Sequence, residues 1–494
     1  MSGAEERLRP LFHPRGIIVT GVSSHPGKFG TVAYHNLLRF GYAGEVFPIN
    51  RDSAEVLGRP TLSDVSEVPK GAADLAVICT PAHVNAELLR ACAGVGVRAA
   101  FVASGGYGEV DAEGVELERE LVALADELGV VIVGPNGQGL VSTSVSMCAQ
   151  IVAPYPPPGS ISLVSQSGNL ASSLMNYGCL SGVGFSKGVS CGNSAQLEVS
   201  DYLDYFANDP DTAVSLSYLE GIEDGRRFLD VARRHTARKP LVVLRGGVTP
   251  LGKRAASSHT GALASDDQIF QGVCRQAGIA RAETVEEAYE VAATFATQPL
   301  PHGRRTLLLT AAGGWGVLTA DACVAAGLDL IALPEDLYAE IDKRAPARWS
   351  RGNPVDLAGG ERRDTVPEVL DLAAAHPDVD AILYLGLGIQ AAQAEVFRSG
   401  RFHPDYGLDR MAEFHSRQDR RYALAATEAS RRHQKPVLVA TDLVYTDRAY
   451  GNAGPLGVAE SGRIAYPSGH RAVSALAHLA RYAEYRRRLE SPDS

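Results

Sequence analysis

The sequence lacks the features of a secreted, metal-binding or membrane-spanning protein. Its seven cysteines are scattered and form no C-x-x-C pair, which argues against a disulfide framework and a zinc site. No apolar run is long enough to span a bilayer. Residues 1–14 are charged and carry neither the apolar core nor the cleavage site of a secretory signal. We therefore expect a cytoplasmic protein with reduced, mostly buried thiols and no metal of its own.

Long basic segments are also missing. The 47 lysines and arginines are outnumbered by 57 aspartates and glutamates, which gives a net charge of −10. The short basic run at residues 486–488 is more typical of a solvated helix end than of a nucleic-acid site. We expect neither a nucleic-acid partner nor a membrane partner.

What the sequence does contain is one structural unit used repeatedly. A short apolar strand is followed by a turn rich in glycine and serine, and then by a helix with apolar residues three and four apart. Such units begin at residues 16, 161 and 306. At 494 residues the chain is too long for one ordinary core. The pattern predicts an α/β protein of three consecutive doubly wound domains with mostly parallel sheets.

Proline-rich stretches at residues 155–159 and 298–303 suggest the boundaries. They predict domains at residues 1–150, 151–300 and 301–494. The polar stretch 390–420 is not assigned to any element. Further strands are expected at residues 75–79, 99–103, 130–133, 214–219, 240–245, 381–386 and 436–440.

The first turn, at residues 21–30, joins a strand to a helix amino terminus, where phosphate is a natural ligand and an ordinary tight turn is the alternative. The turn is not a G-x-G-x-x-G, and Asn50 and Arg51 follow the second strand where an NAD site would offer an acid. Arg51 could face the ribose phosphate of NADP or of coenzyme A, and Lys28 could reach a pyrophosphate. These residues alone leave both ligands open, as well as a solvated surface role.

A loop of small residues at 257–264 contains one imidazole, His259. A histidine in a polar loop is most often a plain surface residue. Here glycine and serine permit close approach of a phosphate, and Glu220 stands at the end of a predicted strand, where α/β folds carry catalytic groups. A carboxylate bonded to one imidazole nitrogen makes the other the better nucleophile. Glu220 could equally be a helix cap or an ion-pair partner.

The nearby segment 247–254 resembles a P-loop in its glycines and lysine but has Arg254 where a hydroxyl is required.

The first domain resembles the coenzyme A-binding domain of succinyl-CoA synthetase α subunits and of ADP-forming acetyl-CoA synthetases. The matching segments fall in order at successive strand ends, at residues 21–30, 48–50, 78–82, 104–109 and 134–136. Two positions depart from the family: Arg51 replaces a usual proline, and Gly137-Gln138 replaces a Cys or Ser followed by Leu or Pro. The resemblance implies that coenzyme A is held by Gly21, Ser23, Ser24, Lys28, Phe29, Gly30, Asn50, Arg51, Thr80, Pro81, Ser104, Gly105, Gly106 and Asn136.

The resemblance to this acyl-CoA synthetase (NDP-forming) superfamily continues along the chain. Residues 258–264 resemble the phosphohistidine loop, residues 218–222 the segment with its supporting acid, and residues 313–318 and 351–356 the third domain. The fold implied is a Rossmann-like CoA-binding domain followed by two flavodoxin-like domains of the succinyl-CoA synthetase type. Departures are the missing acid at residues 194–196 and Ser265 in place of a glycine. The site residues implied are the catalytic His259 and Glu220, and for phosphate Ser165, Gln166, Ser167, Gly168, Gly192 and Asn193.

The family also uses an ATP-grasp module, for which no stretch of this chain is left over. The resemblance therefore implies a β-type partner chain that carries ATP-grasp, ATP or ADP and magnesium, in a homodimer or heterotetramer. The implied reaction makes acyl-CoA from a carboxylic acid through acyl phosphate and phosphohistidine. Two alternatives remain: a non-catalytic CoA or acyl-CoA binding protein, and an ATP-independent acyl transferase that uses CoA. The sequence specifies neither the acid nor the nucleotide.

Overall fold

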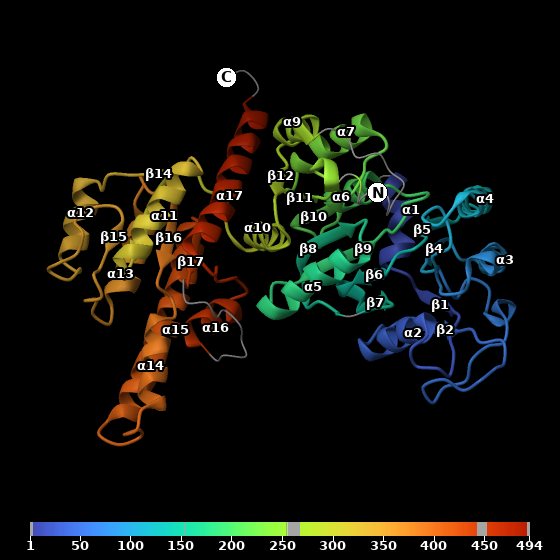
Figure 1. The fold of residues 1–494 in the computed structure, drawn as a ribbon, viewed down its shortest axis with the longest axis horizontal. Helices are drawn as coiled ribbons and strands as arrows, with labels where there is room; N and C mark the ends of the chain where they lie inside the picture. Colours follow the sequence, from blue (N-terminus) through green and yellow to red (C-terminus); the bar gives the residue numbers. More distant parts are fainter. Residues whose placement is uncertain (1–2, 153, 253, 255–266, 442–451, 492–494) are drawn as a thin grey trace. The chain divides into compact units, whose positions relative to one another are not determined.

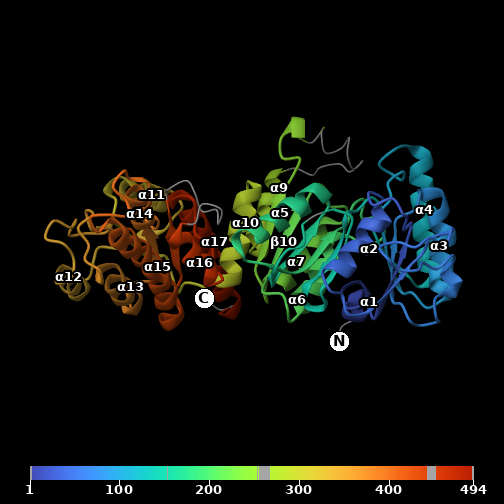
Figure 2. The ribbon, with the colours of Figure 1, turned by 90° about the horizontal axis from the view of Figure 1, so that it is seen from below.

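The computed structural model describes residues 3–152, 154–252, 254, 267–441 and 452–491 (Figures 1 and 2). By its internal contacts the chain divides into two compact units. The first contains residues 1–179 and 184–288, and the second contains residues 180–183 and 289–494. Each unit is considered by itself. Among the described helices, none is both long and apolar enough to cross a bilayer.

The first sheet of unit one is parallel throughout, with the strand order β2-β1-β3-β4-β5. Both of its faces are covered, because Ile17 and Val19 pack in one core with Leu37 of α2, while Ile18 packs in another with Leu89 of α3 and Leu121 of α4. Strands buried on both faces are expected to be continuously apolar, as these are. The elements are α1 (Gly3–Phe12), β1 (Gly16–Thr20), α2 (Phe29–Arg39), β2 (Glu45–Pro48), η1 (Val65–Glu67), β3 (Leu75–Ile78), α3 (Ala82–Gly94), β4 (Ala99–Val102), α4 (Ala112–Leu128) and β5 (Val131–Val133).

The second sheet of unit one has seven strands in the order β12-β11-β10-β8-β9-β6-β7. It is parallel except at the β6 and β7 edge, where β6 pairs antiparallel with both β7 and β9. Residues 139–150 thus belong to the second sheet by their hydrogen bonds, although they precede the domain boundary expected after residue 150. That boundary stays a prediction. The elements are β6 (Gly139–Ser142), η2 (Thr143–Val145), β7 (Met147–Gln150), β8 (Pro158–Ser165), α5 (Gly168–Ser181), β9 (Phe185–Ser190), α6 (Val199–Asn208), β10 (Val214–Leu219), α7 (Gly225–Thr236), β11 (Leu241–Arg245), α9 (Asp267–Ala277) and β12 (Ala280–Ala282).

Unit two contains a third sheet, again parallel, with β13 at its centre beside β14, β15 and β16, and with β17 next to β16. α10 (Val285–Thr297) leads into it from unit one. The three consecutive α/β sheets predicted from the sequence are thereby confirmed. The elements are β13 (Arg305–Thr310), α11 (Gly313–Ala325), β14 (Asp329–Leu330), α12 (Glu335–Asp342), β15 (Val355–Asp356), α13 (Thr365–Ala375), β16 (Ala381–Leu385), α14 (Ile389–Ser399), α15 (Leu408–His433), β17 (Val437–Ala440), α16 (Ala453–Glu460) and α17 (Gly469–Glu490).

The stretch that the sequence left unassigned, 390–420, forms α14 and the start of the 26-residue helix α15 (Figure 1). Two features hid these helices. The buried stripe of α15 combines alanines, such as Ala412, Ala423 and Ala426, with polar residues, so its apolar periodicity is weak. Its outer face is charged, with pairs four residues apart such as Glu413–Arg417 that support a helix without any apolar signal.

The cysteine thiols are free and mostly buried, as expected. Burial raises the pKa of Cys79, Cys92, Cys148, Cys274 and Cys323 to about 12, and that of Cys191 to about 11. These side chains are protonated at neutral pH and act as core residues.

A buried ion pair lies inside unit one. The Lys187 side chain on β9 is fully buried, and its Nζ donates to both carboxylate oxygens of Asp209 at 2.8 Å and to Asp211 Oδ2 at 3.1 Å. Asp209 is itself buried. A buried ion pair contributes little net stability, but removal of one partner leaves an uncompensated charge.

We therefore expect Lys187→Met to lower the free energy of unfolding of unit one by about 3–5 kcal/mol, because Asp209 would remain buried and unpaired. Urea denaturation followed by circular dichroism measures the change. The matched control is Arg119→Ala, which breaks a solvent-exposed ion pair with Glu116 and should shift the transition far less. Equal shifts in the two variants would contradict the buried pair.

Candidate functional site

The predicted catalytic and phosphate-binding residues of the second sheet follow three neighbouring parallel strands. Gln166 follows β8, Gly192 and Asn193 follow β9, and Glu220 follows β10. Because the carboxyl ends of parallel strands meet at one edge of a sheet, these residues share one edge. This is the part of an α/β sheet where ligands commonly bind.

Gln166 joins two of these strand ends. Its Oε1 accepts hydrogen bonds from the backbone N–H groups of Glu220, at 2.6 Å, and Gly221, at 3.2 Å. Its own N–H donates to the carbonyl of Tyr218 at 3.3 Å. The backbone of Glu220 is therefore fixed to the turn before α5. The predicted role of Gln166 in phosphate binding stays a prediction.

The Glu220 carboxylate has a phenol beside it. Burial, reinforced by this carboxylate, raises the pKa of Tyr218, so the phenol keeps its proton and can donate it to Glu220. Glu220 is half-buried and remains accessible. The arrangement orients the carboxylate without removing its capacity to accept a second hydrogen bond.

The turn before α5 is built from serines. Ser165 Oγ donates to the carbonyl of Ser167 at 2.6 Å and accepts from the Ser167 N–H at 3.2 Å. The turn ends at Gly168, the first residue of α5. A helix amino terminus presents unpaired N–H groups and the positive end of the helix dipole, so this turn is suited to an anion.

Gly192 and Asn193 form a turn that faces the first sheet. Gly192 has φ +53°, and a Cβ there would overlap the carbonyl of Pro135. Asn193 Nδ2 donates to Glu109 Oε2 at 2.6 Å and to Glu118 Oε2 at 2.7 Å. The Asn193 amide is thus engaged by two carboxylates of the first sheet, so its predicted role in phosphate binding stays a prediction.

Glu109 is shaped by this contact. Burial would raise the pKa of its carboxyl group, but hydrogen bonds from Asn193 and from the N–H groups of Gly106 and Tyr107 outweigh burial and lower it. Glu109 is therefore ionised at neutral pH. It fixes the 104–109 loop of the first sheet against the second sheet.

The predicted coenzyme A residues lie at the carboxyl edge of the first sheet. Gly21 has φ +71°, and a Cβ on Gly30 would meet the carbonyl of Gly21, so only glycine lets α2 begin so close to β1. Asn50 Nδ2 donates to the carbonyl of Val22 at 2.7 Å and thereby supports this turn. Solvent-exposed positions here include Ser24, Lys28, Phe29 and Arg51, with Phe29 51% exposed.

Asn85, a fully buried residue of α3, was not among the residues predicted from the sequence. Its side-chain amide donates to Thr80 Oγ1 at 2.8 Å and to the Pro81 carbonyl at 3.1 Å, and it accepts from Ser104 Oγ and Tyr107 Oη, both at 2.8 Å. It therefore joins two of the predicted CoA-binding loops. The available signal was a polar residue on the helix face that buries Leu89 and Cys92.

His259 lies outside the described residues. The last strand before it, β11, ends at Arg245 and pairs in parallel with β10, and the next helix described after it, α9, begins at Asp267. Glu220 is thus on the strand next to the one that precedes the histidine loop.

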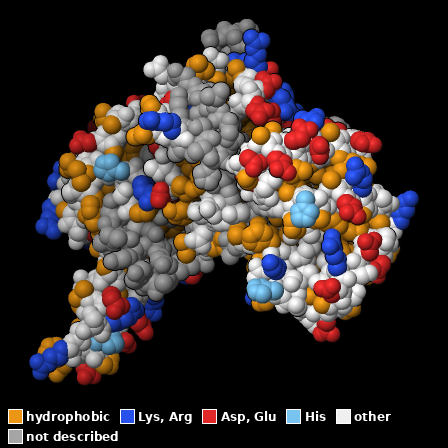
Figure 3. Space-filling model, turned by 45° about the vertical axis from the view of Figure 1, so that its right-hand side comes forward, with side chains coloured by type: hydrophobic (Ala, Val, Ile, Leu, Met, Phe, Trp, Pro, Cys, Tyr) orange, Lys and Arg blue, Asp and Glu red, His pale blue; other side chains and the backbone are white. Residues whose placement is uncertain are grey.

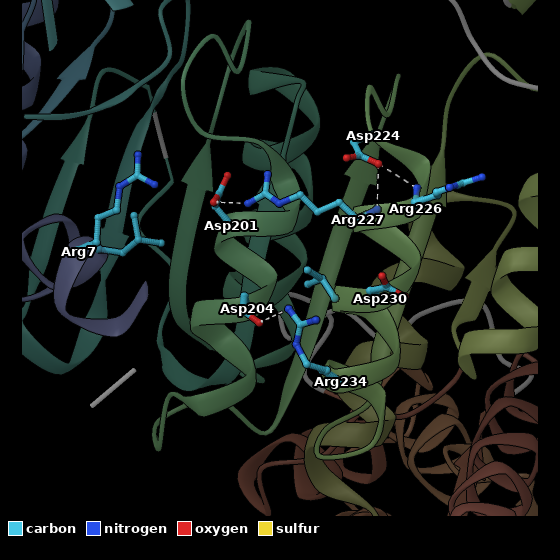
Figure 4. Close-up of a pocket in the computed structure, with 10 residues that line it drawn as sticks. Arg7, Asp201, Asp204, Asp224, Arg226, Arg227, Asp230 and Arg234 are labelled. Atoms are coloured by element: carbon cyan, nitrogen blue, oxygen red, sulfur yellow. Dashed lines mark hydrogen bonds and ion pairs between the residues drawn. The ribbon is translucent and has the colours of Figure 1, made fainter. Parts of the chain in front are cut away.

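Two hollows of unit one differ in character. A cavity of about 70 Å³ lies at the strand ends, lined by Gln166, the 192–194 turn, Ile222 and Phe228 among others. A larger groove of about 530 Å³ lies between α1, α6 and α7 (Figure 4). Two of the arginines that line it are paired with aspartates, Arg227 with Asp201 at 2.6 Å and Arg234 with Asp204 at 3.0 Å. On the surface in Figure 3, acidic and basic side chains are interspersed.

Family models match three consecutive parts of the chain. Residues 15–142 match a CoA binding domain, residues 158–295 a succinyl-CoA ligase like flavodoxin domain, and residues 306–391 a ligase-CoA domain. The three matches fall on the three sheets in order.

Curated relatives and a solved structure agree with these matches. The alpha subunit of ADP-forming acetate–CoA ligase I from Pyrococcus furiosus is 36% identical over 76% of this chain and 82% of its own length. The ADP-forming acetate–CoA ligase I of Archaeoglobus fulgidus is 37% identical over 76% of this chain and 54% of its own length. The dinucleotide forming acetyl-coenzyme A synthetase 1 of Ca. Korarchaeum cryptofilum, solved with phosphate and ADP, matches 99% of both chains with a TM-score of 0.84 and 33% identity. The chain therefore belongs to the nucleoside-diphosphate-forming acid–CoA ligases, as a chain of the alpha-subunit type.

Proposed function

We propose that the chain makes acyl-CoA from a carboxylic acid, coenzyme A and ATP, with His259 as the phosphoryl carrier and with the nucleotide site on a partner chain. The observation that carries the proposal is the Gln166 amide, which fixes the backbone of Glu220 to the turn that opens α5. A candidate orienting carboxylate and a candidate phosphate site are thus built as one structure.

The proposed roles follow from charge and geometry. The unpaired N–H groups at the start of α5 hold the phosphoryl group and neutralise part of its charge. Glu220, oriented by Tyr218 and Gln166, accepts a hydrogen bond from one imidazole nitrogen of His259, so that the other nitrogen is the nucleophile. In this proposal His259 serves two sites, one for the nucleotide and one for the acid.

The proposed reaction has three steps. His259 takes the terminal phosphoryl group of ATP, and ADP leaves. A carboxylate oxygen of the acid then attacks that phosphorus, so the P–N bond breaks and acyl phosphate forms. The coenzyme A thiol, on losing its proton, attacks the carbonyl carbon, and inorganic phosphate leaves. Phosphoryl transfer of this kind depends on positioning and charge neutralisation more than on covalent chemistry by the protein.

Coenzyme A fits the carboxyl edge of the first sheet. The glycine turn permits close approach of a pyrophosphate to the backbone, exposed Lys28 supplies a cation, and half-exposed Phe29 offers an apolar surface. Arg51 follows the second strand and is exposed, so it can meet the 3′-phosphate. We assign the Thr80, Pro81, Ser104 and Asn136 loops to the remainder of the ligand, with Asn85 as their support.

The partner is proposed to be an ATP-grasp β-type chain that carries ATP or ADP and magnesium. Two considerations support it. The Pyrococcus relatives are named alpha subunits, and the Archaeoglobus relative extends well beyond the 54% that this chain matches. We further propose a cytoplasmic homodimer or heterotetramer.

The phosphohistidine assignment predicts a labelling result. With γ-labelled ATP, magnesium and an ATP-grasp partner, this chain should acquire acid-labile, base-stable label, because phosphoramidates hydrolyse in acid. His259→Ala should abolish the label. Glu220→Gln should slow labelling by roughly tenfold or more, since an orienting hydrogen bond to a charged group is removed.

The control is His302→Ala, a histidine outside the site. A His259→Ala chain that labels as well as the parent would refute the assignment. Tight coenzyme A binding without any label, with every partner tried, would instead support the non-catalytic binding protein, and acyl transfer without ATP would support the transferase.

The coenzyme A assignment predicts a difference between two ligands. Arg51→Ala should weaken binding of coenzyme A by roughly tenfold but leave 3′-dephospho-CoA unchanged, because only the former carries the phosphate that Arg51 meets. Isothermal titration calorimetry measures both, and Arg90→Ala, another exposed arginine of the first sheet's helices, is the matched control. Equal losses for both ligands, or tighter binding of NADP than of coenzyme A, would contradict the assignment.

A further inference from the structure

Gln138 lies in the segment that connects the first sheet to the second sheet. The loop 134–138 leaves β5 of the first sheet and enters β6 of the second. The backbone of Gln138 is fixed there, since its N–H donates to Ser190 Oγ at 2.9 Å and its carbonyl accepts from the Ile151 N–H at 3.0 Å. Its side chain is consequently directed from a defined backbone position.

That side chain lies across the first turn of α5. Gln138 Nε2 donates to Asn169 Oδ1 at 3.1 Å, and Gln138 Oε1 accepts from Ser172 Oγ at 3.1 Å. A Cβ on Gly168 would overlap the Gln138 side chain. Glycine at the first residue of α5 therefore permits the observed position of the Gln138 side chain, which a larger residue would displace.

The Gln138 amide retains hydrogen-bonding capacity. A primary amide has two donors and two acceptor lone pairs, and each of its polar atoms uses one here. Among the described residues, no partner accounts for the second amide hydrogen or the second lone pair. The side chain is half-buried, so a bound molecule can reach both atoms.

The sites on either side of Gln138 indicate which molecule binds its amide, and this step rests on the proposed function. The phosphoryl group is assigned to the start of α5, and coenzyme A to the loops of the first sheet. An acyl group passes from the former to the latter, and Gln138 spans the distance between them. We propose that Gln138 contacts the acyl group and selects short carboxylic acids that carry a hydrogen-bonding substituent, such as a hydroxyl, near the carboxylate.

The Gln138 amide would distinguish between acids through the hydrogen bonds that it has left to make. A site built to hydrogen bond a substrate hydroxyl favours that substrate over the analogue that lacks it, because the bound analogue displaces water from the amide without supplying a partner. An aliphatic side chain at residue 138 would reverse that preference. The names of the relatives include acids as different as acetate, 4-hydroxybutyrate and trans-ferulate. Residues near the acyl group must therefore determine the acid specificity.

Binding of acyl-CoA tests the proposal on this chain alone. By calorimetry, the parent should bind 2-hydroxypropionyl-CoA roughly tenfold more tightly than propionyl-CoA, and Gln138→Leu should lose or reverse that ratio. Leucine is common at this position in the resembling family, so the variant is expected to fold, and its thermal midpoint checks this. Ser172→Ala, which removes one tether of the amide, should reduce the ratio in part, and Gln276→Leu, at an exposed glutamine of α9, should not change it.

Turnover with the ATP-grasp partner supplies the second measurement. The ratio of kcat/KM for 2-hydroxypropionate over propionate should fall by roughly tenfold in Gln138→Leu. A parent that prefers propionyl-CoA, or a variant whose ratio equals that of the parent, would overturn the proposal. Absence of label on the parent would refute the phosphohistidine function without affecting the acyl-CoA binding ratio, so the two failures are distinguishable.

Discussion

The site depends on one hydrogen-bonded amide, that of Gln166. Its Oε1 receives two backbone N–H groups from the end of β10, so the turn that opens α5 and the segment that carries Glu220 cannot move independently. A neutral acceptor suits this position, because it satisfies the N–H groups without adding a negative charge where a phosphoryl group is proposed to bind. In the proposed mechanism Glu220 accepts a hydrogen bond from the His259 imidazole, while the amino terminus of α5 binds the phosphoryl group.

A second constraint fixes the first sheet against this structure. β6 leaves the first sheet's last loop and pairs with β9, Asn193 bonds to Glu109 and Glu118, and Gln138 reaches α5. These contacts all lie at or near the carboxyl edges of the two sheets. The edge proposed to bind coenzyme A and the turn proposed to bind phosphate thus belong to one compact unit. The proposed reaction requires this proximity, because the thiol must meet an acyl group held at a neighbouring site.

The sequence predicted the architecture well because strands buried on both faces are continuously apolar and are followed by distinctive turns. β1, β8 and β13 were recognised in this way, and Glu220 and the Ser165–Gly168 turn follow from their places at strand ends. α14 and α15 were missed, since a buried stripe of alanines and polar residues, together with charged pairs, gives little apolar signal.

The long-range partners could not be predicted either. Three such contacts join residues far apart in the sequence. Asn85 bonds to two loops, Asn193 donates to two glutamates, and Gln138 bonds to the first turns of α5. His259 lies outside the described residues, so its place beside Glu220 stays a prediction. Periodicity indicates which residues end a strand, but the direction of a polar side chain is decided by tertiary packing.

We propose that the carboxyl edge of the first sheet and the start of α5 form one reaction site. The decisive measurement is an electron-density map of the chain crystallised with coenzyme A and phosphate. We expect phosphate within hydrogen-bonding distance of the N–H groups of Gly168 and Asn169, and the coenzyme A thiol directed at the 134–138 loop. Phosphate or coenzyme A bound in the charged groove of α1, α6 and α7, with the start of α5 empty, would contradict it.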